Sequence, residues 1–169
     1  MRRLRLCLTL AVAVGTVGCA KEKINCGHGF TVGRLSYEFV DGRGLDWLAR
    51  PGAPPLDSLR RYNAKDRVRV ERPAQRVRIG GYQLDESGVP DGGGDRLYTQ
   101  FPRLSATDTD TVEVLVHFGP LNNSECQRFH SYKAIEIRYN GRPAGSFVGD
   151  AARVYSADWG LVVTLTKIP

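Results

Sequence analysis

The amino-acid sequence predicts an all-β protein, an antiparallel β-sandwich or small barrel of about seven or eight strands with one short helix. Three observations lead to this prediction. Apolar residues recur at every second position in short segments over most of the chain. Turn-forming residues separate these segments, and long helical segments do not alternate with them. The pattern is compatible with either architecture.

The alternating segments place the strands. In the first segment Leu35, Tyr37 and Phe39 alternate with the polar residues Ser36 and Glu38, which predicts a half-buried strand. Most later segments follow the same rule, and the last is rich in β-branched residues, which favour strands. Strands are therefore expected at residues 35–39, 67–70, 76–79, 112–118, 135–139, 142–148 and 161–168.

Turn and cap residues define how the segments connect. Asn140-Gly141 lies directly between two of the expected strands and is the strongest short hairpin signal in the chain. Residues 72–75 can reverse the chain between two further strands. Asp57 is expected to be the N-cap of a short helix over residues 58–62.

The first eighteen residues have the layout of an export signal, with three arginines, a short apolar run and a small-residue end. The run is shorter than the roughly 20 apolar residues that span a bilayer. It ends in Thr16-Val17-Gly18-Cys19, which resembles the lipobox of bacterial lipoproteins at Gly18 and Cys19 and differs from it at the two residues before them. The resemblance implies cleavage before Cys19 and its acylation with palmitate-type chains, which gives a membrane anchor.

The predicted organisation is a signal peptide over residues 1–18, the lipidated cysteine and a tether over residues 19–25, and a single β-rich domain over residues 26–169. Ala20 follows the cysteine, and the resemblance to enterobacterial lipoproteins with a residue other than aspartate there implies an outer-membrane lipoprotein that faces the periplasm. Cleavage after Ala20 is the alternative, and it would release a soluble periplasmic or secreted protein. Three of the 24 basic residues lie in the signal, so the mature part is only slightly basic against its 18 acidic residues. A nucleic-acid partner is therefore not expected.

Two cysteines remain after processing, Cys26 and Cys126. In an oxidising envelope an even pair predicts a disulfide, which would close a loop of about 100 residues. Together with His28 and His130 the two cysteines could in principle hold a metal ion. The single residue between Cys26 and His28 is tighter than usual zinc spacing, and oxidation removes both thiolates, so no metal site is predicted.

The acidic loop residues do not form a calcium motif. Asp91 and Asp95 flank three consecutive glycines, and Asp108 and Asp110 are separated by one threonine. Neither arrangement has the alternating ligands and closing glutamate of a calcium-binding loop. These segments, including the polar loop over residues 85–95, are expected to be flexible solvated turns.

The most distinctive surface is a pair of strands in which arginine and valine or isoleucine alternate. Period two places Val68, Val70, Val77 and Ile79 on one face and an arginine cluster on the other. Guanidinium groups suit bidentate contact with phosphate or carboxylate, so the cluster is a candidate site for an anionic ligand. The alternative is a solvated strand face whose charge prevents aggregation. The four candidate residues are Arg67, Arg69, Arg76 and Arg78.

No catalytic motif is recognisable, and no cofactor is predicted. The sequence therefore favours a noncatalytic envelope module that contacts another envelope protein or an anionic envelope polymer through its basic face. The alternative is a small envelope hydrolase with a site built from loops around His117 or His130, or a factor like the lysozyme inhibitors. Those inhibitors are also small β-rich domains, with a disulfide that joins an early strand to a late segment, and Cys26 followed by a strand is similar in outline. Their Ser-Gly-x-Arg-Tyr loop is absent here.

Overall fold

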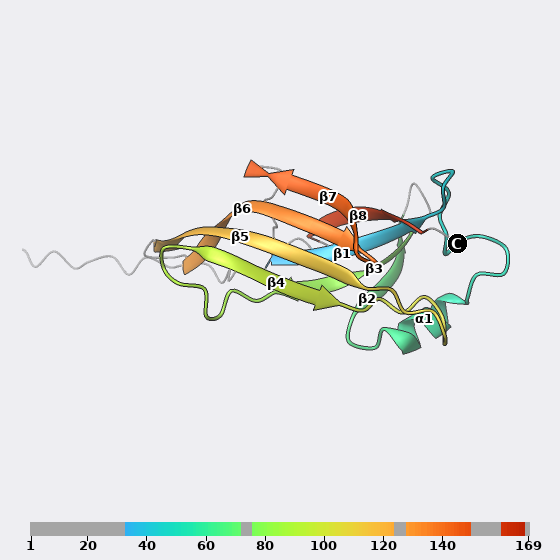
Figure 1. Cartoon of the computed structure of the whole chain (residues 1–169). Helices are drawn as coiled ribbons and strands as arrows, with labels where there is room; N and C mark the ends of the chain where they lie inside the picture. The colour runs from blue at the N-terminus through green and yellow to red at the C-terminus, as the bar shows by residue number, and fades with distance from the viewer. Residues whose placement is uncertain (1–32, 72–75, 124–127, 150–159, 168–169) are drawn as a thin grey trace, which may run out of the picture.

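Two four-stranded sheets stack face to face in the computed structural model, which describes residues 33–71, 76–123, 128–149 and 160–167 (Figure 1). The predicted all-β class is confirmed, and of the two architectures the sandwich is the one formed. The elements in chain order are β1 (Gly33–Val40), α1 (Leu56–Tyr62), β2 (Arg67–Glu71), β3 (Arg76–Leu84), β4 (Gly94–Gln100), β5 (Val112–Asn123), β6 (Arg128–Tyr139), β7 (Arg142–Val148) and β8 (Leu161–Thr166).

The first sheet has the strand order β2-β3-β1-β8 and the second has the order β4-β5-β6-β7. All neighbours are antiparallel except β1 and β8, which run parallel and pair from Leu35 with Leu161 to Val40 with Thr166. Parallel strands cannot be joined by a two-residue hairpin, and here six other strands lie between β1 and β8 in the chain. The sheet is therefore mixed, where the sequence predicted an antiparallel one.

The core lies between the sheets and comes from alternate residues of their inner faces. Leu35, Tyr37 and Phe39 of β1 are completely buried, as are Val114 of β5 and Ile135 of β6. This burial accounts for the period-two pattern, because successive strand residues point to opposite faces. The Tyr37 hydroxyl also donates a hydrogen bond across the core to Gln100 Oε1 of β4.

Two local predictions have different outcomes. The hairpin at Asn140-Gly141 is confirmed: both residues have positive φ, 48° and 78°, as a tight turn with the twist of the flanking strands requires. The predicted N-cap is wrong. The helix begins two residues earlier, at Leu56, its N-cap position is Pro55 without a side-chain bond, and Asp57 lies in the first turn.

Strand β4 has no counterpart among the predicted strands. Its apolar residue Leu97 points outward and is 59% exposed, whereas Gln100 is buried and bonded to Tyr37. At these two positions polarity is inverted relative to burial, although Tyr98 between them packs against the core. The sequence pattern carried no strand signal there for this reason.

Candidate functional site

The predicted arginine cluster lies on the outer face of the ribbon formed by β2 and β3. Val68, Val77 and Ile79 are buried beneath it, which confirms the alternation at these positions. Val70 departs from the prediction, because it is 45% exposed near the end of an edge strand. We call the outward residues Arg67, Arg69, Arg76 and Arg78 the Arg face.

Glu38 of β1 holds two members of the Arg face in place. Arg76 Nη1 donates to Glu38 Oε2 at 2.8 Å, and Arg78 Nε donates to Glu38 Oε1 at 2.6 Å. The carboxylate side chain is only 6% exposed, while the two arginine side chains are 35% and 24% exposed. Burial alone would raise the pKa of Glu38, but the hydrogen bonds and charges of the two arginines outweigh it and keep the pKa below its usual value.

Glu38 is the residue of this surface that the sequence did not single out. It was expected only as a polar partner of Tyr37 and Phe39 in an alternating strand. The register places it directly opposite Arg78, and Arg78 in turn is opposite Arg69 on β2. The sequence signal for this contact was an acidic residue at an outward position of a strand. Which strand lies beside that residue is decided by the tertiary fold.

The neighbouring basic residues contribute to the same edge only in part. Arg60 of α1 forms an ion pair with Asp57 at 3.4 Å and points its Nε at the Val68 carbonyl oxygen at 3.5 Å. Both residues of this ion pair are well exposed, so it adds little stability. Helix α1 packs beside β2, and this contact brings Arg60 to the edge of the Arg face.

The two described histidines have different surroundings. His117 lies on the outer face of the second sheet, with Nδ1 2.8 Å from Asp95 Oδ1 and Nε2 3.5 Å from Glu136 Oε1. Its side chain is 28% exposed, and its neighbour Glu136 is one of the residues that line a groove of about 270 Å³. His130 is buried, and its Nδ1 is 2.9 Å from the Gly119 carbonyl oxygen. The carboxylate contact that a hydrolase would need is present at His117, but on an open sheet face rather than in a deep pocket.

The predicted lipidation site and disulfide lie outside the described residues, as does His28. This applies to Cys19, Cys26 and Cys126 alike. In the part of the chain that is described, no group of three or more His, Cys, Asp or Glu side chains is arranged to hold a metal ion. No helix in that part is long and apolar enough to cross a membrane.

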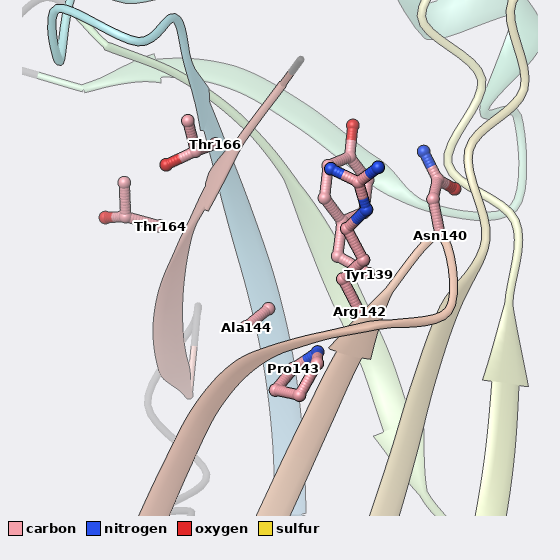
Figure 2. A pocket seen from close by; sticks show the side chains of 7 residues that line it. All are labelled: Tyr139, Asn140, Arg142, Pro143, Ala144, Thr164 and Thr166. Carbon is pink, nitrogen blue, oxygen red and sulfur yellow. The ribbon is translucent and has the colours of Figure 1, made fainter.

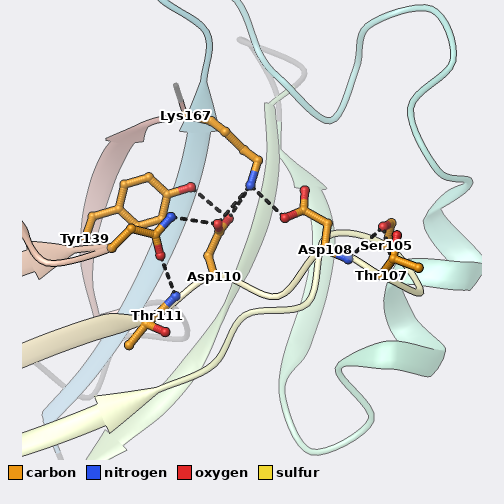
Figure 3. A network of polar contacts seen from close by, with 8 residues as sticks. Ser105, Thr107, Asp108, Asp110, Thr111, Tyr139 and Lys167 are labelled. Carbon is orange, nitrogen blue, oxygen red and sulfur yellow. Dashed lines mark hydrogen bonds and ion pairs between the residues drawn. The ribbon is translucent and has the colours of Figure 1, made fainter. Parts of the chain in front are cut away.

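Asp108 and Asp110 were predicted to lie in a flexible solvated turn, but both form hydrogen-bonded ion pairs with a buried lysine (Figure 3). Lys167 Nζ donates to Asp108 Oδ1 at 2.9 Å and to both carboxylate oxygens of Asp110 at 2.8 and 2.9 Å. The Tyr139 hydroxyl and the Asn140 amide donate to Asp110 as well, at 2.7 and 2.9 Å. Asp110 is 2% exposed. The cluster fastens the end of β8 to the second sheet, and we assign it a structural role.

The loop between β3 and β4 is also anchored, contrary to the prediction of flexibility. The Glu86 carboxylate accepts hydrogen bonds from the His130 amide at 2.9 Å and the Tyr132 hydroxyl at 3.1 Å. The Leu121 amide donates to the Asp91 carbonyl oxygen at 2.7 Å. A carboxylate near the start of the polar segment 85–95 has the sequence character of a solvated loop residue, because the strand that it contacts is more than forty residues away in the chain.

A groove of about 420 Å³ opens between β7 and β8, at the side of the sandwich where the two edge strands lie next to each other (Figure 2). Its lining carries one formal charge, that of Arg142, since the other side chains are uncharged. The lining residues are Tyr139, Asn140, Arg142, Pro143, Ala144, Thr164 and Thr166.

Comparison of the chain with protein-family models, with curated proteins and with solved structures found no significant match. The class of protein therefore follows from the fold and its surfaces alone. The chain is a mixed two-sheet β-sandwich with an arginine-rich outer face on one sheet and a polar groove at the opposite edge of that sheet.

Proposed function

We propose that the protein is a noncatalytic, lipid-anchored binding module of the bacterial envelope, and that its Arg face contacts an anionic envelope polymer or an acidic surface of another envelope protein. The observation that carries the proposal is the ion-paired arrangement of Arg76, Glu38 and Arg78. A carboxylate that is nearly buried between two guanidinium groups holds them in fixed positions on an outer sheet face.

Fixed guanidinium groups lose less side-chain entropy when a ligand binds, which favours affinity. Arg76 bonds Glu38 through one Nη1 hydrogen, so most of its five N–H donors remain to bond a phosphate or carboxylate. Arg67 and Arg69 are exposed on the adjacent edge strand and extend the basic surface. The cluster is larger than protection of an edge against aggregation needs, since β3 is not an edge strand.

The membrane anchor in the proposal rests on the export signal and on Cys19 in its lipobox-like context. Metabolic labelling with a fatty-acid analogue should tag the wild-type protein and not a Cys19→Ser variant. Label on both proteins, or on neither, would remove the anchor from the proposal.

To test the Arg face, its arginines are replaced in a way that leaves no buried charge without a partner. Replacing Arg76 and Arg78 alone would strand the Glu38 carboxylate, so the variant carries glutamine at all four positions of the Arg face and also Glu38→Gln. A control variant with the same change in net charge carries Arg43→Gln, Lys133→Gln and Arg138→Gln, three exposed residues elsewhere on the molecule.

Binding of lipopolysaccharide and of acidic lipid vesicles is measured for wild type and both variants at low salt and near 150 mM salt. The wild type should bind at least one of the two probes, more weakly at higher salt, because exposed charges are screened over about 8 Å at physiological ionic strength. The Arg-face variant should lose most of the binding and the control variant should retain it. Equal binding by the two variants, with both folded, would refute the proposal for these polymers.

A further inference from the structure

The four edge strands of the sandwich differ in how they are protected against pairing with another chain. Edge strands in stable proteins are usually blunted by charges, proline or a bulge. Strand β2 carries two arginines and a glutamate, and β4 begins with Gly94, Asp95 and Arg96. Strand β7 contains Pro143, and its pairing with β6 shifts register between Ile137 and Arg138.

Strand β8 has none of these features. Its sequence is Leu-Val-Val-Thr-Leu-Thr, which is uncharged and rich in β-branched residues. Its pairing with β1 is regular over six residues without a bulge. No described strand pairs with its other edge. An unprotected, regular and uncharged edge of this kind is a template for the addition of a further strand.

The groove beside β8 has room for such a strand, and it carries one positive charge. It opens between β8 and β7, where an added strand would direct one row of side chains toward Ala144 and Tyr139 (Figure 2). Arg142 stands at the end of this groove and is exposed. Among the described residues, no carboxylate forms an ion pair with it. The cation in the groove therefore has no counter-charge on the described surface.

We propose that the edge of β8 and the adjoining Arg142 form a docking site for an extended acidic segment of another protein, which pairs with β8 as a ninth strand and places a carboxylate on Arg142. Main-chain hydrogen bonds to β8 supply affinity in this mode of recognition, and the side-chain contacts supply specificity. The bidentate geometry of guanidinium and carboxylate explains why the segment is acidic.

A second copy of the chain fits the site less well. Two β8 strands could pair edge to edge, but β8 contains no acidic residue to reach the partner's Arg142. The Arg face and this groove also lie at opposite ends of the strand order β2-β3-β1-β8. The docking site is thus separate from the Arg face, and it can be tested without reference to it.

The probe is a displayed library of random peptides of about twelve residues, roughly twice the usual strand length, selected on the immobilised full-length protein. Enriched peptides should contain Asp or Glu within an extended, β-prone sequence. Hydrogen exchange of the protein should then slow at the amides of residues 161–166 when an enriched peptide is bound, and not at those of β4. Substitution Arg142→Gln should weaken binding about tenfold, as expected for a lost charge-assisted hydrogen bond.

The matched control is Arg138→Gln, which removes the same charge from an exposed residue of the neighbouring strand β6. It should leave the affinity within about twofold of wild type. Four outcomes would overturn the proposal: no enrichment, enriched peptides without a carboxylate, equal effects of the two substitutions, or protection outside β8. Protection of β8 that grows with protein concentration in the absence of peptide would instead identify a second copy as the occupant and would also overturn it.

Discussion

The buried cluster around Lys167 makes a quantitative prediction about stability. Lys167→Met keeps most of the volume and apolar stem of the side chain but removes the ammonium group that bonds Asp108 and Asp110. The Lys167 side chain is 11% exposed and that of Asp110 is 3% exposed, so the variant leaves a buried carboxylate without its cation. Breaking a buried ion pair from one side costs about 3 to 5 kcal/mol. At about 2 to 4 °C per kcal/mol for a chain of this size, the melting temperature should fall by about 6 to 20 °C.

A double variant distinguishes loss of the ion pair from simple damage to packing. Asp110→Asn in the Lys167→Met background removes the unpaired charge, so the double variant should regain more than half of the lost free energy of unfolding. Urea unfolding followed by fluorescence measures the free energy of unfolding of the single and the double variant. Lys133→Met, on the exposed face of β6, is the control. A loss below about 1 kcal/mol for Lys167→Met, or no recovery in the double variant, would show that the cluster is not the clamp that its geometry indicates.

Two further predictions concern Glu38 and the cysteines. The pKa of Glu38 in the folded protein is below its ordinary value of 4.5, so the ion pairs stabilise the fold above that pH, and this stability is lost as the pH falls through the folded pKa. Urea unfolding between about pH 6 and pH 3 should therefore show a steeper loss of stability for wild type than for Glu38→Gln. Parallel curves for the two proteins would contradict the ion pairing. Thiol titration of the denatured, unreduced mature protein should find essentially no free cysteine, and Cys126→Ser should lower stability by about 2 to 5 kcal/mol, whereas two titratable thiols would rule out the Cys26–Cys126 bridge.

The strands that the sequence predicted correctly share one property. Their inward apolar residues are buried, as at Tyr37 of β1, Ile79 of β3 and Val114 of β5, although in β1 the polar residues Ser36 and Glu38 on the other face are buried too. Strand β4 lacks this agreement, because Leu97 is outward and Gln100 is buried. Alternating polarity predicts a strand only where the apolar residues are the buried ones. It does not predict a strand in which the buried residue is a glutamine that is hydrogen-bonded across the core.

The candidate sites show the same division. The alternation in residues 67–79 was sufficient to place the arginines on one outward face, because side-chain direction in a strand is local. The partnership with Glu38 was not predictable, because it depends on β1 lying beside β3 across a sequence separation of about 40 residues. The unprotected edge of β8 was likewise not predictable from the sequence, since a strand is an edge strand only by its position in the sheet.

The sequence by itself therefore determined the all-β class, the hairpin at Asn140-Gly141 and the outward direction of the Arg face, each of which depends on residues close together in the chain. Only the tertiary structure decided the strand order, the parallel pairing of β8 with β1, and the burial of Asp110 against Lys167. The physical reason is that strand pairing and ion pairing across a sandwich join residues whose separation along the chain carries no periodic signal. Local chemistry selects the elements, and the packing of two sheets selects their neighbours.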